Sequence, residues 1–167
     1  MTGVQTCALP ISARTAFSQA ASAGILNEDT ADQLSRETRA EARYNLAILA
    51  QESGSLSAVT AELEAALKAW PAHPESLLMS LAVAGVRRDQ GEQGRLLDRL
   101  LNLPATRRFD AVTLRSFLPG PDGALLLADA LVRSGDLTGA RRLIADTLAA
   151  ANPGTDPQSL AALKAWF

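Results

Sequence analysis

The chain has 167 residues and a formal net charge of −2, with acidic and basic side chains interspersed along it. It therefore offers no basic face dense enough to neutralise the phosphates of a nucleic acid, which is disfavoured as a partner. One histidine and one cysteine are too few for a transition-metal centre. The longest uncharged apolar stretch, residues 76–86, is shorter than the roughly 18 residues that a membrane span needs.

Residues 1–11, MTGVQTCALPI, differ from everything that follows. They lack the basic residues and apolar core of a secretory signal, and they show neither helical nor strand periodicity. Every position matches the translation of a short-read sequencing adapter, with GTG read as the start codon. We interpret the segment, including Cys7, as an artefact and expect the natural sequence to start near Ser12, without its true N-terminus. The excess of arginine over lysine suggests a bacterial source. Without the true N-terminus, the expected location of the protein is either the bacterial cytoplasm or the periplasm.

No segment shows the alternation of apolar and polar residues typical of strands, so the predicted fold is all-α. The first helix is expected over residues 12–24. A long helix should then run from a cap at Asn27 or Asp29 to Gly54, either unbroken or divided near Ser35 or Thr38.

The next two helices have clear boundary signals. Ser55 should cap a one-sided apolar helix that Pro71 ends. Pro74 suits the first turn of a helix through about Asp89, which is apolar almost all round and should be the most enclosed helix of the chain.

The second half of the chain predicts four more helices. One covers residues 92–103, and GEQG at 91–94, where it starts, is interpreted as a helix-breaking turn. Asp110 should cap a short helix over 110–118, and Pro119-Gly120-Pro121 breaks the chain. A hairpin follows, made of residues 123–134, a turn at Gly135-Asp136 and residues 137–151. Asp156 should cap a last helix that runs to Phe167.

The stretch Ala40–Pro71 resembles a tetratricopeptide repeat, a helical hairpin of about 34 residues with small or apolar residues at fixed positions, Gly at the turn and Pro at the end. The matching positions here are Leu46, Ala47, Ala50, Gly54, Val59, Leu63, Ala66 and Pro71, whereas Arg43 stands where the family has a large apolar residue.

A second stretch, residues 121–152, resembles the same family. Its matching positions are Ala124, Leu127, Ala128, Leu131, Gly135, Ala140, Ile144 and Thr147, with Pro153 one residue late. Gly54 and Gly135 are 81 residues apart, 13 more than two such periods. The resemblance therefore implies a repeat domain over residues 12–167 with units at about 40–73, 74–104 and 121–153. The middle unit departs from the length rule, and the short helix at 110–118 is the expected insertion.

The resemblance implies a short α-solenoid of stacked hairpins with a concave groove that binds a segment of a partner protein. The family's groove-facing positions correspond here to Glu41, Tyr44, Ile48, Gln51 and Glu52, and to Asp122, Leu125, Asp129, Val132 and Arg133. The chaperone-binding members clamp a carboxylate with Lys and Asn at two of these positions, where this chain has Tyr44 and Ile48, then Leu125 and Asp129. A carboxylate clamp is therefore not expected. Tyr44 is either an interface anchor or a packing residue.

No catalytic, cofactor-binding or metal-binding motif is present in the sequence, and an enzyme is not expected. His73, between two prolines, reads as an exposed turn residue, which would leave no Ser-His-Asp arrangement. Paired carboxylates such as Glu62 and Glu64 read as solvated helix surface.

Two hypotheses for the function stay open. The first is a scaffold that binds a partner segment in the groove, and the second is a structural spacer or assembly arm of a larger envelope or secretion protein without a groove ligand. Truncation of a repeat array would uncover apolar faces at both ends and favour self-association. The residues expected to be exposed are Ala13–Ala23, Leu160, Leu163, Trp166 and Phe167.

Overall fold

The computed structural model describes residues 13–19, 29–151 and 156–166, and these residues form helices and their connections, without a strand. The all-α prediction is confirmed for this part of the chain. The segment 1–11, and with it the adapter interpretation, lies outside the described residues. The chain divides into two compact units, Met1–Ser80 and Leu81–Phe167, and the division falls within helix α4.

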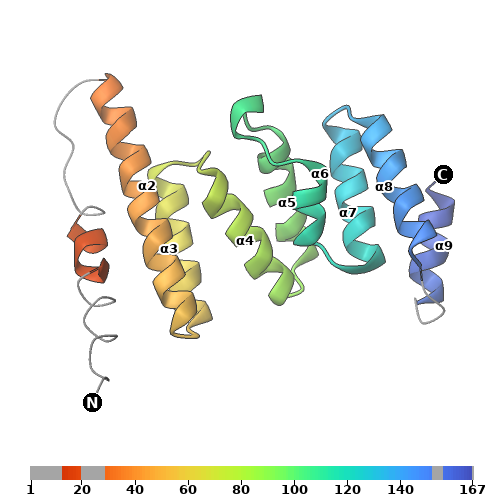
Figure 1. The fold of residues 1–167 in the computed structure, drawn as a ribbon, viewed down its shortest axis with the longest axis horizontal. Coiled ribbons are helices and arrows are strands. Elements are labelled where there is room, and N and C mark those ends of the chain that lie inside the picture. The colour runs from red at the N-terminus through yellow and green to blue at the C-terminus, as the bar shows by residue number, and fades with distance from the viewer. Residues whose placement is uncertain (1–12, 20–28, 152–155, 167) are drawn as a thin grey trace, which may run out of the picture. The chain divides into compact units, whose positions relative to one another are not determined.

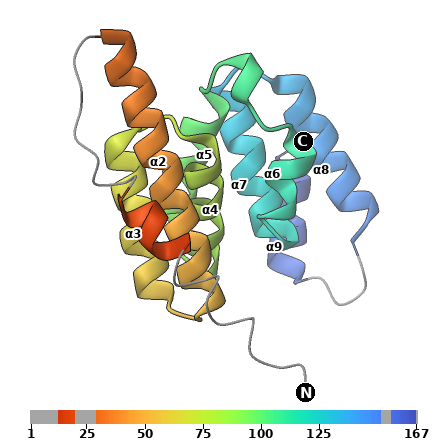
Figure 2. The ribbon, with the colours of Figure 1, turned by 60° about the vertical axis from the view of Figure 1, so that its left-hand side comes forward.

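The first unit is built on an antiparallel pair of helices, α2 (Asp29–Glu52) and α3 (Leu56–Ala69), which lie side by side in both ribbon views (Figures 1 and 2). Helix α2 is continuous, so the alternative of a break near Ser35 or Thr38 is wrong. Residues 13–19 are helical, and α4 (Pro74–Val86) begins in this unit. The buried apolar side chains of α2 and α3 are Ala40, Ala42, Leu46, Ala47, Ala50, Val59, Leu63 and Ala66.

Arg43, which departs from the expected apolar residue of the resembling pattern, is half-buried between α2 and α3. Its guanidinium binds the carboxylate of Glu62 on α3 at 2.9 Å, and both side chains are half-buried. The expectation that Glu62 is simply solvated is therefore wrong. This charged pair links α2 to α3.

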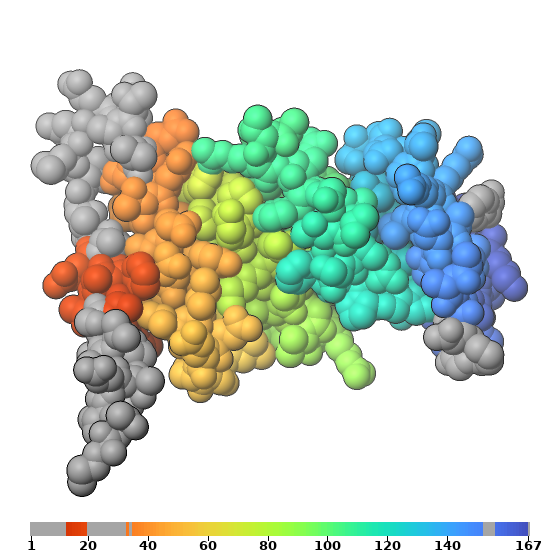
Figure 3. Space-filling model, viewed as in Figure 1, coloured from red at the N-terminus to blue at the C-terminus, as the bar shows by residue number. Residues whose placement is uncertain are grey.

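In its described residues, the second unit contains the end of α4 and five further α-helices. These are α5 (Gln90–Leu101), α6 (Ala111–Ser116), α7 (Gly120–Arg133), α8 (Leu137–Ala149) and α9 (Pro157–Ala165), with a 3₁₀ turn η1 (Ala105–Arg107) before α6. Helix α7 is the centre of the unit, because it packs against α5, α6, α8 and α9. The surfaces of α7 and α8 join directly at the blue end of the space-filling view (Figure 3).

Three of the helix-to-helix turns have the same hydrogen-bond pattern. In each, a residue with positive φ donates its N–H to a carbonyl three residues earlier, and the next residue donates to a carbonyl five residues earlier, which is the Schellman motif. The positive-φ residues are Gly54 (73°), Arg88 (56°) and Gly135 (90°). The side chain of the residue that follows each then caps the next helix: Ser55 accepts a hydrogen bond from Ala58 N, Asp89 from Glu92 N and Asp136 from Gly139 N.

The spacing of these turns can be compared with the 34-residue period of the resembling pattern. Arg88 lies 34 residues after Gly54, so the middle hairpin keeps the period of the first, and the 13 additional residues lie between Arg88 and Gly135. The sequence pattern missed this turn because an arginine stands where the other two turns have glycine. The prediction that residues 91–94 break a helix is wrong, because Asp89 caps α5 and these residues form its first turns.

Two other expectations are corrected by burial. Helix α4 buries Leu77, Leu81 and Ala84, but Val86 is 71% exposed, so the helix is not enclosed on all sides. At the other end of the chain, Leu163 is fully buried rather than exposed, because α9 packs on α7 and α8. Leu160 and Trp166 are half-buried, whereas Phe167 and residues 20–23 lie outside the described residues.

Candidate functional site

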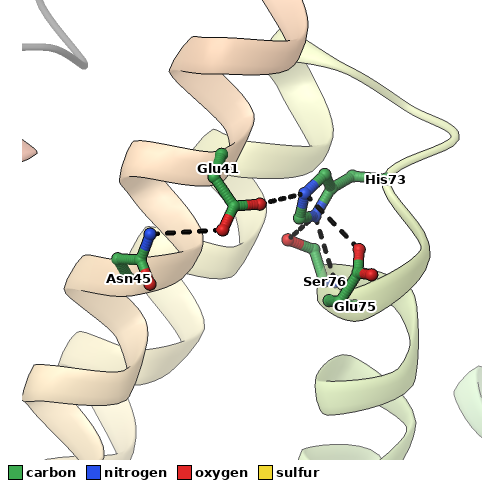
Figure 4. Close-up of polar contacts among 5 residues, drawn as sticks. All are labelled: Glu41, Asn45, His73, Glu75 and Ser76. Atoms are coloured by element: carbon green, nitrogen blue, oxygen red, sulfur yellow. Dashed lines mark hydrogen bonds and ion pairs between the residues drawn. The ribbon is translucent and has the colours of Figure 1, made fainter.

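The corner between α3 and α4 holds a polar cluster centred on the buried His73 (Figure 4). The His73 ring is 2% exposed, with Nε2 at 3.0 Å from a Glu41 carboxylate oxygen and 3.6 Å from Glu75. On its other side, Nδ1 lies 2.8 Å from Ser76 Oγ and 3.2 Å from the Ser76 backbone nitrogen. The expectation that His73 is an exposed turn residue is wrong, because the imidazole is held between these partners.

The hydrogen bonds assign a role to each ring nitrogen. The Ser76 backbone N–H can only donate, so Nδ1 carries the lone pair and the ring proton is on Nε2, which donates to Glu41. The His73 carbonyl also accepts from Leu77 N. His73 therefore acts as the N-cap of α4, with an imidazole nitrogen in the place usually taken by an oxygen.

Ser76, His73 and Glu41 form a hydrogen-bonded chain with the residue types of a catalytic triad, which the sequence reading excluded. The Ser76 hydroxyl is fully buried, however, and a nucleophile has to reach its substrate. The cluster is thus a structural junction between α2 and α4, in which two of the bonds satisfy the start of α4.

Two aromatic rings pack on the same imidazole. The His73 ring centroid lies 5.7 Å from that of Tyr44 and 5.2 Å from that of Trp70. Burial raises the pKa of the Tyr44 phenol, and the nearby carboxylates of Glu75 and Glu41 raise it further. Of the five residues predicted for the first groove, Glu41 and Tyr44 meet at this corner, whereas Ile48 is half-buried and Gln51 and Glu52 are exposed.

The predicted groove residues of α7 make contacts within the second unit. Asp122 accepts a hydrogen bond from Ser159 Oγ at 2.9 Å, and Asp129 accepts one from Trp166 Nε1 at 3.1 Å. Arg133 binds Asp98 on α5 through two nitrogens, at 2.8 and 3.0 Å. Helix α7 therefore uses these polar groups to hold its neighbours. Leu125 is half-buried and Val132 is 37% exposed.

A pocket of about 680 Å³ opens in the second unit, between the end of α4, the start of α5 and the connection from α6 to α7. Ala82, Gly85 and Val86 of α4 form one wall, and residues 116–119 form another. Arg115 fixes the latter wall by donating to the carbonyls of Leu118 and Gly120. The pocket thus has a wall made by the additional residues between the middle and last hairpins.

The pocket also contains polar side chains that the sequence analysis did not single out. Gln93 is 9% exposed, and its carboxamide has no hydrogen-bond partner among the residues that the structure describes. Arg88, in the left-handed conformation, also lines the pocket, and so does Asp122, which is one of the predicted groove residues. Shifting the predicted groove residues Ile48, Gln51 and Glu52 by 34 positions would have found Ala82, Gly85 and Val86, but that shift needs the Arg88 turn.

Comparison of the chain with protein-family models, with curated proteins and with solved structures found no match. In the described part of the chain, no helix is both long and apolar enough to cross a membrane. Nor do the described side chains include a group of three or more His, Cys, Asp or Glu residues that could hold a metal ion. The pocket of the second unit is the candidate functional site.

Proposed function

We propose that this protein is a tetratricopeptide-like helical-repeat scaffold, and that the pocket of its second unit binds a segment of a partner protein. The repeat character is supported by the three Schellman turns, two of which are one 34-residue period apart. Each of these turns is followed by a side-chain N-cap at the same position.

The burial pattern supports the same alignment. The core residues Ala47, Ala50, Leu63 and Ala66 of the first hairpin correspond, 34 positions later, to Leu81, Ala84, Leu97 and Leu100, all of which are buried. In the last hairpin the corresponding residues Ala128, Leu131 and Ile144 are buried as well. The middle copy replaces small residues by leucines, which explains why its sequence resembles the family less.

One observation carries the functional proposal. The pocket is lined by Ala82, Gly85 and Val86, the middle-copy equivalents of the groove positions, and Val86 is 71% exposed. An exposed valine beside a concave surface is a favourable place for an apolar side chain of a ligand. The wall is mixed in character, since Arg88 and Asp122 contribute opposite charges. A short peptide segment with apolar and polar side chains fits such a surface.

The test is selection of peptides from a displayed random library against the full chain, followed by titration of the selected peptides. Val86→Asp should weaken binding by about tenfold or more, roughly 1.4 kcal/mol. Val112→Asp is the matched control, because Val112 is 82% exposed on α6 and does not line this pocket. Peptides that bind both variants equally would contradict the proposal.

The spacer hypothesis also has an observation in its favour. Asp122, Asp129 and Arg133, three of the predicted groove residues, bind Ser159, Trp166 and Asp98 of the chain itself. A helix that uses its polar groups in this way suits a rigid arm. A library that yields no peptide dependent on Val86 would favour this second function.

A further inference from the structure

The Gln93 carboxamide is the least satisfied buried polar side chain among the described residues. His73 and Ser76, the other two buried polar residues, are hydrogen-bonded to each other and to their neighbours. Gln93 is nine-tenths buried and lines the pocket, yet no described residue bonds its side chain. A carboxamide offers two donor hydrogens and one acceptor oxygen, and burying them without partners costs stability. Such a group is expected to serve another purpose.

The equivalent positions in the other hairpins show that the fold does not need a polar residue here. Val59, 34 residues before Gln93, is 3% exposed, and Ala140, 47 residues after it, is fully buried. Both are core residues without a polar side-chain atom. An apolar residue at position 93 would serve the hairpin equally well, so Gln93 is the exception among the three.

Gly85 on α4 makes room for the glutamine. A Cβ atom at position 85 would lie 3.2 Å from Gln93 Nε2, closer than side chains normally pack. The same Cβ would lie 3.9 Å from the Phe117 carbonyl oxygen on the opposite wall. The equivalents of Gly85 in the other hairpins are Gln51 and Val132. Gly85, which lacks a side chain, and the buried carboxamide of Gln93 thus occur together in the hairpin that lines the pocket.

We infer that Gln93 recognises a main-chain amide of an extended segment of a partner protein. Its NH₂ group would donate to a ligand carbonyl and its oxygen would accept from a ligand N–H, which satisfies both ends of the carboxamide. Ala82, Val86 and Leu126 would contact the short apolar side chains beside that amide. The opposite charges of Arg88 and Asp122 suit a polypeptide better than a polyanion. This inference rests on the proposed function and specifies which group of the partner Gln93 binds, namely a main-chain amide.

The experiment uses the peptides selected above, each also synthesised with single N-methylated amides. One N-methylated position should bind the wild type at least about tenfold more weakly, because its N–H to Gln93 is lost. Gln93→Leu should weaken the parent peptide similarly and should be insensitive to N-methylation at that position. Gln158→Leu is the matched control, since Gln158 is an exposed glutamine on α9 that does not line the pocket; it should change the affinity less than twofold, within about 0.4 kcal/mol.

The outcomes distinguish peptide binding in the pocket from recognition of a main-chain amide by Gln93. Peptides that depend on Val86 but bind Gln93→Leu as tightly as the wild type would overturn the role of Gln93 and leave the proposed function standing. Absence of any Val86-dependent peptide would overturn the proposed function. If Gln93→Leu loses its helicity, Gln93→Met replaces it, and the N-methylation scan on the wild type decides independently: a peptide with no sensitive amide contradicts the inference.

Discussion

The two ends of α4 bury polar side chains in opposite ways. At its start, His73 is 2% exposed and both ring nitrogens have partners, which cap the helix and tie it to α2. Beyond its end, Gln93 is 9% exposed and has no side-chain partner among the described residues. The comparison shows that burial alone does not distinguish a structural polar group from a group that is available to a ligand. The hydrogen-bond partners do.

A second feature beyond the end of α4 is also unfavourable for stability, in addition to the unpartnered carboxamide of Gln93. Arg88 adopts φ 56°, a conformation that the other two equivalent turns assign to glycine. Arg88 and Gln93 line the same pocket. Unfavourable local features that coincide at one site are typical of a functional surface, where stability is given up for recognition. The start of α4 shows no such cost.

The strongest test of this comparison is His73→Leu. Loss of the ring nitrogens removes the cap of α4 and leaves the buried Ser76 N–H and hydroxyl without their partner. We expect the free energy of unfolding to fall by about 3 kcal/mol. Urea denaturation followed by circular dichroism measures it. Glu75→Gln is the control and should change the stability by less than about 0.5 kcal/mol, because Glu75 is half-exposed and 3.6 Å from the ring; equal effects would contradict a structural role specific to His73.

Gln93→Leu should change the free energy of unfolding in the opposite direction to His73→Leu. A leucine of similar size removes a buried amide without partners and gains apolar contact, so the free energy of unfolding should rise by about 1 kcal/mol. The same denaturation experiment applies. A loss of stability would mean that the carboxamide has a partner in the folded chain, and would remove the contrast with His73.

Arg88→Gly tests the strained turn. Glycine adopts positive φ without steric cost, so the variant should be more stable by about 1 kcal/mol, while peptides that contact the guanidinium should bind more weakly. Gly135→Ala is the matched control, since it places a Cβ at the equivalent turn, φ 90°, and should lose about 1 kcal/mol. Thermal melts of both variants give the comparison, and a less stable Arg88→Gly would show that the arginine side chain holds the turn.

Most helices and their caps could be predicted from the sequence, because these signals are local. Ser55, Asp110 and Asp156 cap the helices as the sequence predicts, whereas Asp136, predicted only as a turn residue, also caps a helix, α8. The turn between α4 and α5 was not predicted, because it has Arg88 where the other two turns have glycine. An arginine gives no local sequence signal for positive φ.

The errors at the candidate site have a different physical reason. The burial of His73 depends on Glu41, 32 residues away, and the pocket around Gln93 depends on the inserted segment 116–119. Neither neighbour is close in the sequence. Position 93 could still have been noticed, since a glutamine stands in α5 at the position that corresponds to the apolar residues Val59 and Ala140, but only after the repeat period is known.

The smallest expected effect concerns exposed polar caps, which complete the comparison with His73. Asp110 accepts from Thr113 N at 2.6 Å and Asp156 from Ser159 N at 2.8 Å, and these hydrogen bonds lower the pKa of each carboxyl group. A lowered folded-state pKa means that the unfolded chain takes up protons first as the pH falls. The contribution is therefore complete above the unfolded pKa of about 3.9 and is lost as the pH falls through the folded value.

Asparagine keeps a capping oxygen without the charge, so the double variant Asp110→Asn, Asp156→Asn isolates this effect. Its melting temperature should lie slightly below that of the wild type at neutral pH, and the difference should vanish in strong acid. The measurement is thermal denaturation of both proteins across the acidic range. A difference that stays constant with pH would show that the charge of these caps does not contribute, and that only their hydrogen-bond geometry stabilises α6 and α9.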